Sequence, residues 1–88
     1  MKPVLSIVMP ALNEAAGIAP LLMALQPLRA RGVEIVLVDG GSTDGTVQQA
    51  APWVDAVVAP GRGRAVQMNA GAAAASADRL LFLHADTR

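Results

Sequence analysis

The sequence has no cysteine and a single histidine, His84, among its 88 residues. Without cysteine, disulfide frameworks, thiolate zinc sites and cysteine nucleophiles are excluded. One histidine also excludes any metal site built from several imidazoles. Aromatic side chains are almost as scarce, because only Trp53 and Phe82 are present. This scarcity removes the stacking platforms on which many proteins bind single-stranded nucleic acids.

The sequence also lacks an excess of charge of either sign, since seven basic residues balance seven acidic ones. A neutral chain offers no electrostatic basis for binding nucleic acid or a polybasic contact with a membrane. No apolar run approaches the roughly 18 residues of a membrane-spanning helix. The start, Met1–Pro3, is weakly basic, and the apolar stretch after it is interrupted at Pro10. This is a poor signal peptide, so we expect a cytoplasmic protein.

Four short runs rich in Val, Ile and Leu are predicted to be strands, because each is bounded by Gly, Pro, Asn or Asp. They are Val4–Met9, Val33–Val38, Ala56–Ala59 and Arg79–Leu83. The first two are apolar almost throughout, which is typical of strands buried on both faces of a parallel sheet.

Helices are expected between these strands. Apolar residues recur at helical spacing over Ala16–Arg31. We expect the regular helix to begin near Gly17, with Pro20 in its first turn, and to bend or end early at Pro27. The other predicted helices are Thr43–Ala51, with Asp44 near its N-terminus, and the alanine-rich Arg64–Ala77. The resulting βαβαβαβ order predicts an α/β fold, a parallel β-sheet with helices on both faces, as one Rossmann-like unit over residues 1–88.

Polar residues follow each predicted strand. They are Asn13 and Glu14, then Asp39–Asp44, then Gly61–Arg64, and finally His84, Asp86 and Thr87. Because the carboxyl ends of parallel strands open onto one edge of the sheet, we expect these residues to converge there around a ligand.

Each polar segment has a structural and a functional interpretation. Asp39–Gly45 is either a turn with a helix cap or a loop whose Asp39 accepts hydrogen bonds from a nucleobase or ribose. Gly61–Arg64 is either a solvated loop or a phosphate-binding one. It does not match a nicotinamide-dinucleotide fingerprint, because Val66 occupies the third glycine position and the segment follows the third strand.

The last polar segment combines two different kinds of residue. His84 has an ordinary interpretation as a structural hydrogen bonder. Asp86 is a single carboxylate at the mouth of the sheet, and it suits a hydrated Mg²⁺ or Mn²⁺ ion that also binds substrate phosphates. Asp55 and Asp78 precede strands, and are assigned to caps and turns at the opposite edge.

Taken together, these motifs resemble the family 2 inverting glycosyltransferases. Four segments correspond in order to the family's first strand and loop, second strand and loop, third helix and Asp-x-Asp motif. They are Val4–Glu14, Val36–Thr46, Arg64–Gly71 and Leu81–Thr87. The resemblance covers essentially the whole chain. It departs from the family's usual pattern at His84, which stands where the first aspartate of Asp-x-Asp is expected.

The resemblance implies the N-terminal half of a GT-A fold, which binds a nucleoside-diphosphate sugar, commonly a UDP-sugar, with Mn²⁺ or Mg²⁺. The positions it assigns to the donor are Pro10, Leu12, Glu14, Asp39, Arg64 and Ala85, with Asp86 as the metal ligand. Pro10, Leu12 and Glu14 would line the nucleoside pocket. Asp39 would contact the base, and Arg64 would lie near the base or the phosphates.

Family members are more than twice as long as this chain, so we expect it to supply the donor half and to be inactive alone. The general base and the acceptor site would lie beyond Arg88, and membrane contact of a longer parent stays open. One alternative is a non-catalytic nucleotide-binding or self-assembling module. A nucleotidyltransferase is less well matched, because Pro10–Glu14 has neither glycine nor a basic residue.

The expected strand order is 3-2-1-4, which leaves the fourth strand at an edge. Its apolar run Leu80–Leu83 would then be exposed. An exposed apolar edge strand pairs readily with another chain, so we expect self-association through this strand.

Overall fold

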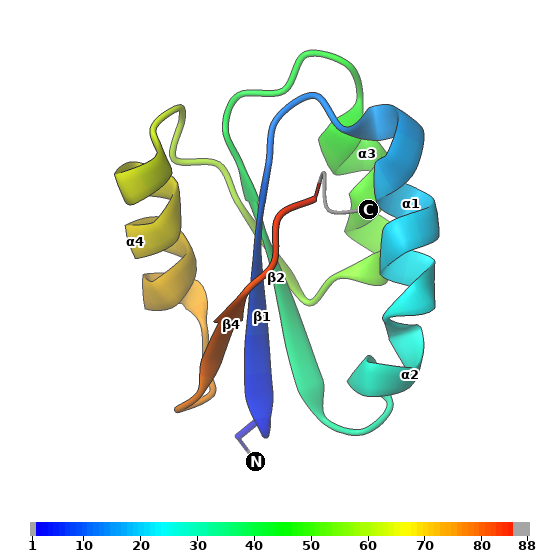
Figure 1. Cartoon of the computed structure of the whole chain (residues 1–88), viewed down its shortest axis with the longest axis vertical. Coiled ribbons are helices and arrows are strands. Elements are labelled where there is room, and N and C mark those ends of the chain that lie inside the picture. The colour runs from blue at the N-terminus through cyan, green and yellow to red at the C-terminus, as the bar shows by residue number, and fades with distance from the viewer. Residues whose placement is uncertain (1, 86–88) are drawn as a thin grey trace.

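A computed structural model describes residues 2–85 and contains the predicted parallel sheet (Figure 1). In chain order, the elements are β1 (Leu5–Ala11), α1 (Ala15–Ala24), α2 (Gln26–Arg29), β2 (Val33–Asp39), α3 (Thr46–Ala50), the 3₁₀ helix η1 (Ala51–Trp53), β3 (Ala56–Val58), α4 (Arg64–Ala74) and β4 (Leu80–Phe82). The strand order is β3-β2-β1-β4, so the fold class and the predicted order are both confirmed.

The two central strands carry most of the sheet. Strands β1 and β2 pair in parallel over their full lengths, from Leu5 opposite Val33 to Ala11 opposite Asp39. Each edge strand pairs over only three residues, β4 with β1 and β3 with β2. The long central pair therefore brings the end of β1 next to the end of β2.

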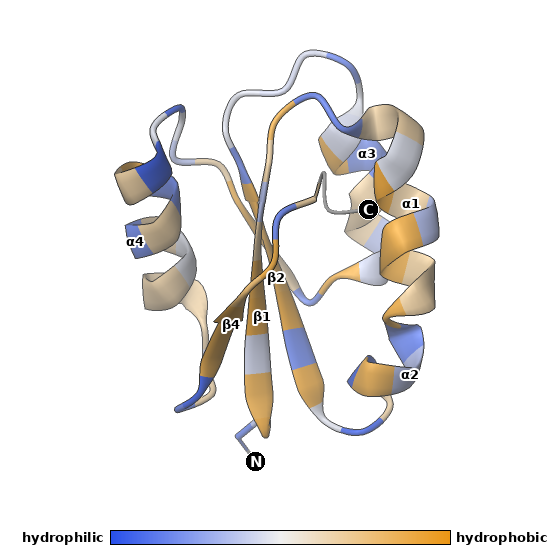
Figure 2. Ribbon diagram, in the orientation of Figure 1, coloured by the Kyte–Doolittle hydropathy of each residue, from blue (hydrophilic) through white to orange (hydrophobic). Residues whose placement is uncertain are grey.

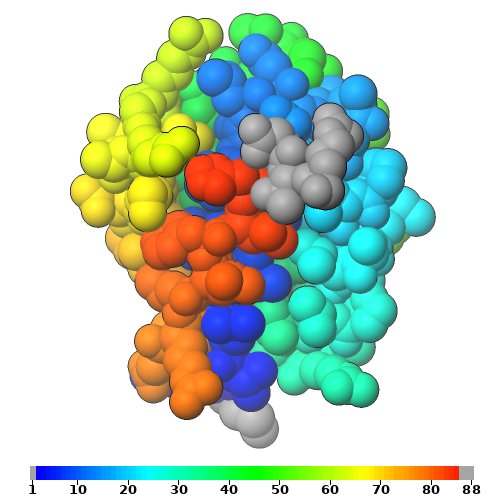
Figure 3. Space-filling view, viewed as in Figure 1, coloured from blue at the N-terminus to red at the C-terminus, as the bar shows by residue number. Residues whose placement is uncertain are grey.

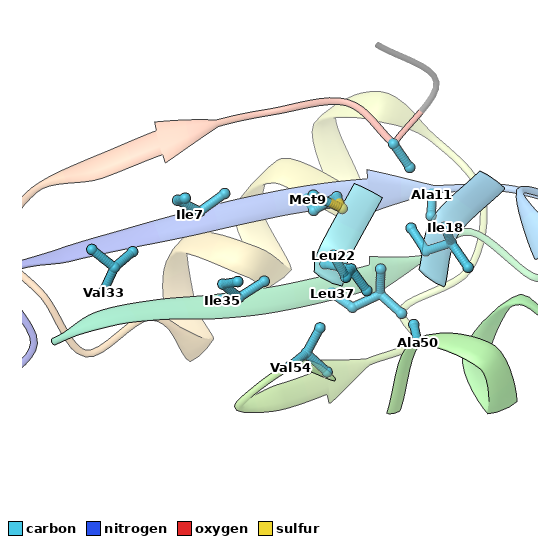
Figure 4. Packing of buried hydrophobic residues seen from close by; sticks show 11 residues of the cluster. Ile7, Met9, Ala11, Ile18, Leu22, Val33, Ile35, Leu37, Ala50 and Val54 are labelled. Atoms are coloured by element: carbon cyan, nitrogen blue, oxygen red, sulfur yellow. The ribbon is translucent and has the colours of Figure 1, made fainter. Parts of the chain in front are cut away.

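Helices cover the two faces of the sheet unequally. Helices α1 and α3 lie on one face and α4 lies on the other (Figure 1). Since side chains alternate along a strand, Ile7 and Met9 of β1 point into the α1 side, whereas Val8 packs with the α4 side. Figure 4 shows how Ile18 and Leu22 of α1 lie over these strands.

The first helix differs from its prediction at its start and agrees at its end. It begins at Ala15 rather than near Gly17, so Pro20 lies inside it. The early start is possible because another loop caps the helix: the amide of Glu14 donates to Thr46 Oγ1 at 2.8 Å, and that of Ala15 donates to Asp44 at 3.1 Å. As expected, the regular helix ends before Pro27.

The second predicted helix starts late and the third ends early. Helix α3 begins at Thr46, three residues after the predicted Thr43, because Asp44 turns back to accept hydrogen bonds from Thr46. Helix α4 stops at Ala74 instead of Ala77. The amide of Ser76 donates to Glu34 at 2.8 Å and that of Ala77 donates to Ser6 at 3.1 Å, so two polar side chains on the sheet end the helix.

Strand β4 is an exposed apolar edge, as expected, but Leu83, the last residue of the predicted run, is half-buried against the hydrophobic cluster on the α1 side. Leu80, Leu81 and Phe82 retain 38%, 47% and 36% of their accessible surface. Figure 2 shows this strand as hydrophobic, and Figure 3 shows its segment uncovered at the surface. Among residues 2–85, no helix has the length and apolar character needed to span a bilayer.

Candidate functional site

An open pocket of about 250 Å³ lies where β1 and β4 end and α4 begins. Its lining residues come from all three segments: Pro10, Ala11, Leu12, Glu14, Arg64, Gln67 and His84. Four of the predicted donor residues, Pro10, Leu12, Glu14 and Arg64, are therefore brought together as expected. The pocket combines an apolar wall with a carboxylate, a guanidinium, an amide and an imidazole.

Pro10 helps to open the sheet at this point. Its carbonyl accepts a hydrogen bond from Ala85 at 3.2 Å, so this side of Pro10 faces the segment after β4. Because proline has no N–H, Pro10 cannot donate a second hydrogen bond to the segment after β4. Regular pairing between β1 and β4 ends at Val8 opposite Phe82, and the pocket lies beyond that pair.

The loops after β1 and β2 are tied together by reciprocal hydrogen bonds. The amide of Asn13 donates to Ser42 Oγ at 2.8 Å, and Thr43 donates its amide to Asn13 Oδ1 at 2.9 Å. Asn13 adopts a left-handed conformation with φ of 54°, which asparagine tolerates better than most residues. These contacts hold the pocket residues Leu12 and Glu14 beside the second loop.

Asp39 stabilises its own loop. It is only 4% exposed, and its Oδ2 accepts hydrogen bonds from the amides of Gly41 at 3.0 Å and Ser42 at 2.9 Å. The Ser42 hydroxyl donates to Oδ1. Asp39 does not line the pocket, so this geometry supports the turn-forming interpretation, and the contact with a base stays a prediction.

Asp44 is the second organising carboxylate of the same loop. Its hydrogen bond from the Thr46 hydroxyl is the main cause that lowers the pKa of Asp44; desolvation opposes it as the second-largest cause, and the amides of Ala15 and Thr46 lower the pKa further. The ionised form is therefore favoured in the folded protein. Asp44 joins the start of α1 to the start of α3.

Glycines shape the approach to α4. Gly61 and Gly63 have φ of 96° and 118°, conformations that other residues rarely adopt. Gly63 directly precedes the helix, and Arg64 is its first residue. Arg62 and Arg64 are both exposed, but only Arg64 lines the pocket. The loop therefore presents one guanidinium to the pocket.

The segment after β4 contributes His84 to the pocket and does not contribute Ala85. Ala85 is 7% exposed, and its side chain belongs to the hydrophobic cluster on the α1 side. The predicted metal ligand, Asp86, lies outside the described residues. Within residues 2–85, no group of three His, Asp or Glu side chains is placed to hold a metal ion.

Two pocket residues, Ala11 and Gln67, were not predicted from the sequence, and Gln67 is the polar one. It lies three residues after Arg64 and four before Gly71, so all three occupy one side of α4. Gly71 faces the sheet, where a Cβ would come within 2.8 Å of Val38 Cγ2 and still closer to Val8 Cγ1. That helical spacing was the signal that could have placed Gln67 at the pocket.

Asp55 and Asp78, predicted to serve in caps and turns at the opposite edge, instead form ion pairs, and Asp55 also binds a strand amide. Asp55 accepts a hydrogen bond from the Ile35 amide at 2.7 Å and forms an ion pair with Arg29 at 3.0 Å. Asp78 pairs with Lys2 at 2.9 Å. These carboxylates are remote from the pocket, which lies at the carboxyl ends of the strands.

A parallel sheet with a polar pocket at the carboxyl ends of its strands is the arrangement in which α/β proteins bind their ligands. Residues 6–88 match the family described as glycosyl transferase family 2. The chain therefore belongs to this family. No curated protein matches it with significant sequence similarity.

Two solved structures illustrate the likeness. Mannosyl-3-phosphoglycerate synthase from Rubrobacter xylanophilus has 26% identity and a TM-score of 0.85, over 98% of this chain and 31% of that protein. Glucosyl-3-phosphoglycerate synthase from Mycobacterium tuberculosis, in complex with Mn²⁺, UDP and glucosyl-3-phosphoglycerate, has 31% identity and a TM-score of 0.84, over 96% and 34%. Both confirm the GT-A type of fold. The chain spans about a third of their length.

Proposed function

We propose that this chain forms the donor-binding half of a glycosyltransferase that uses a nucleoside-diphosphate sugar, most simply a UDP-sugar. The pocket at the ends of β1 and β4 is the observation that carries the proposal, because it gathers Glu14, Arg64 and His84 beside an apolar wall. The Mycobacterium tuberculosis synthase has been crystallised with UDP and Mn²⁺, which supports the same nucleotide and ion here.

The lining residues suit the parts of such a donor. Pro10 and Leu12 offer an apolar surface to the nucleoside, and Glu14 can accept hydrogen bonds from hydroxyl groups. Arg64 can donate to diphosphate oxygens, for which a guanidinium is well shaped. The carboxylate of Asp39 already accepts hydrogen bonds from its own loop, so it would bind the base only through an oxygen lone pair that these bonds leave free.

The proposed ion is Mn²⁺ or Mg²⁺, with Asp86 as its protein ligand. Such ions take one or two carboxylates and complete their shell with phosphate oxygens and water, so a single carboxylate at this edge of the sheet suits one. When bound, a divalent ion neutralises charge on the departing diphosphate. We further propose that acceptor binding, the general base and inversion at the sugar depend on chain outside these residues.

A calorimetric titration of this chain with UDP, with and without Mn²⁺, tests the donor site. We expect saturable binding that Mn²⁺ strengthens. Arg64→Ala should weaken binding by about tenfold or more, because it removes a charge-assisted hydrogen bond. The matched control is Arg31→Ala, an exposed arginine at the other end of the sheet. A folded chain that binds no UDP under either condition would contradict the proposal.

The exposed edge of β4 favours a second proposal, that copies of this chain associate through this strand. Leu80, Leu81 and Phe82 offer both apolar surface and backbone groups to a partner strand. Because the strand has only three residues, the interface is far smaller than the ~800 Å² per partner of a stable complex, and association should be weak.

Sedimentation over a wide range of protein concentration tests this association. We expect the wild-type chain to gain mass with concentration and Leu81→Lys to remain monomeric. Val57→Lys is the control on the other edge strand, where Val57 is 38% exposed. A wild-type chain that stays monomeric at high concentration would argue against edge pairing.

A further inference from the structure

The amide of Gln67 connects the first turn of α4 to the end of β2. Its Nε2 donates to the carbonyl oxygen of Val38 at 3.2 Å. Because the acceptor is a carbonyl, the atom that faces it must be the amide nitrogen. Gln67 also lines the pocket and is half-buried. It is therefore the side chain of α4 that contacts both the pocket and the sheet.

The lack of a side chain at Gly40 leaves room for the amide of Gln67. A Cβ at Gly40 would lie 3.0 Å from Gln67 Nε2, 3.3 Å from Cδ and 3.4 Å from Oε1. Gly40 is not among the residues with positive φ, so its backbone would accept alanine without strain. The missing side chain at Gly40 is thus explained by the space that the Gln67 amide occupies.

The first turn of α4 has little else to hold it. No side chain caps the helix, and the apolar contacts of α4 with the sheet come from Ala70 and Ala74, beyond the first turn. Arg64 is one helical turn before Gln67, so its position over the pocket follows the position of that turn. A shift of the turn away from β2 would carry the Arg64 guanidinium with it.

We propose that Gln67 is a positioning residue of the donor pocket, which holds the first turn of α4, and with it Arg64, against Val38 and Gly40. This inference rests on the proposed donor-binding function. Gln67 acts through Arg64, and the energy of its hydrogen bond appears in ligand affinity as well as in folding.

A double-mutant cycle on folding tests the contact without any ligand. Gly40→Ala should shift the folding equilibrium toward the unfolded state by about fivefold in the wild-type chain, because the new methyl group displaces the Gln67 amide from its hydrogen bond to Val38. In a Gln67→Ala background the same change should cost less than about twofold. Additive effects would overturn the contact itself, whatever the chain binds.

A second cycle on affinity for UDP with Mn²⁺ tests the positioning role. Gln67→Ala and Gln67→Met should each weaken binding by about fivefold, since both lose the hydrogen bond and the second keeps the volume. Arg64→Ala should then cost less affinity in the Gln67→Ala background than in the wild type. Gln49→Ala, on an exposed glutamine of α3, is the matched control and should change nothing.

The outcomes separate the two proposals. Coupling in the folding cycle together with coupling to Arg64 in the affinity cycle supports positioning. Coupling in folding with wild-type affinity in both Gln67 variants overturns positioning and leaves a purely structural contact. A wild-type chain that binds no UDP overturns the proposed function, and the positioning role with it, while the folding cycle still reports whether the contact exists.

Discussion

The two faces of the sheet are held together in opposite ways. On the α1 side, eleven buried residues of the described chain form one hydrophobic cluster, with large side chains such as Ile18 and Leu22 between helix and sheet. On the α4 side, three buried valines form a small cluster, and small or short side chains pack against it from β3, α4 and the chain after α4: Ala56, Val58, Ala70, Ala74 and Ala75. Large side chains fill the space between helix and sheet on the α1 side. On the α4 side, the lack of side chains at Gly71 and Gly40 lets the helix lie close to the sheet.

This difference bears on the candidate site. The pocket takes Arg64 and Gln67 from α4, so part of the site stands on the face with the smaller core. A helix that approaches the sheet through glycine and alanine brings its backbone, and any polar side chain near its start, close to the strand ends. The same small residues leave little apolar contact to resist displacement. Removal of side-chain volume should therefore destabilise the α1 side, whereas addition of volume should destabilise the α4 side.

The largest expected effect is the removal of volume from the α1 side. Leu22 is fully buried, so Leu22→Ala should lower the free energy of unfolding by about 3 kcal/mol through lost transfer energy and a residual cavity. Urea denaturation followed by circular dichroism measures this. Met23→Ala, at a neighbouring residue that is 52% exposed, should change the free energy of unfolding by less than about 0.5 kcal/mol. Equal effects would refute the comparison.

Next in size is the addition of volume on the α4 side. Gly71→Ala should lower the free energy of unfolding by about 2 kcal/mol, because the new Cβ would overlap Val8 and Val38 on the two central strands. It should also weaken UDP binding as α4 moves away from the sheet. Ala72→Val, on an exposed position of the same helix, should cost only about 0.5 kcal/mol of helix propensity. A stabilised Gly71→Ala protein would show that α4 is not in close contact with the sheet.

A smaller effect is expected in the loop that borders both faces. Asp39→Ala leaves the amides of Gly41 and Ser42 without their acceptor, and should lower the free energy of unfolding by about 1–2 kcal/mol. Ser42→Ala removes one loop hydrogen bond and keeps the carboxylate, so it serves as the comparison for UDP affinity. If Asp39 contacts the base, Asp39→Ala weakens binding more than Ser42→Ala does. Equal affinities would restrict Asp39 to the turn.

The smallest expected effect is a pH dependence from Asp44. The pKa of Asp44 is lowered on folding from 3.8, so its contribution to stability is fully present above that value and is lost as the pH falls through the lower folded-state pKa. Asp44→Asn should remove this acid-side decline. Unfolding measured between about pH 5 and pH 2 checks it, with Asp78→Asn as an exposed control. Identical pH profiles for the wild type and Asp44→Asn would contradict the role of Asp44.

Several features of the site were predictable from the sequence because they depend on local pattern. Unbroken apolar runs indicated buried parallel strands, and parallel strands place their carboxyl ends at one edge. The meeting of Pro10, Glu14 and Arg64 at one pocket follows from those two facts. The exposed apolar edge at β4 follows in the same way from the strand order.

Other features depended on partners distant in the sequence. The start of α1 at Ala15 required caps from Asp44 and Thr46, about thirty positions along the chain. Gln67 looked like any polar residue on a helix until the structure placed it against Gly40. Asp39 has the same sequence pattern whether it faces a ligand or its own loop, and only the tertiary structure shows that its oxygens turn toward Gly41 and Ser42.

By itself, the sequence determined the class of fold and the edge at which the polar residues gather, because hydrophobic periodicity and the handedness of crossovers act over short stretches of chain. The order of the strands was expected from the usual arrangement of such half-folds. The tertiary structure decided which polar groups face the pocket and which bind the protein itself. That choice belongs to the tertiary structure because a hydrogen bond such as Gln67 to Val38 depends on how closely a helix approaches the sheet, and here two glycines far apart in the sequence permit that approach.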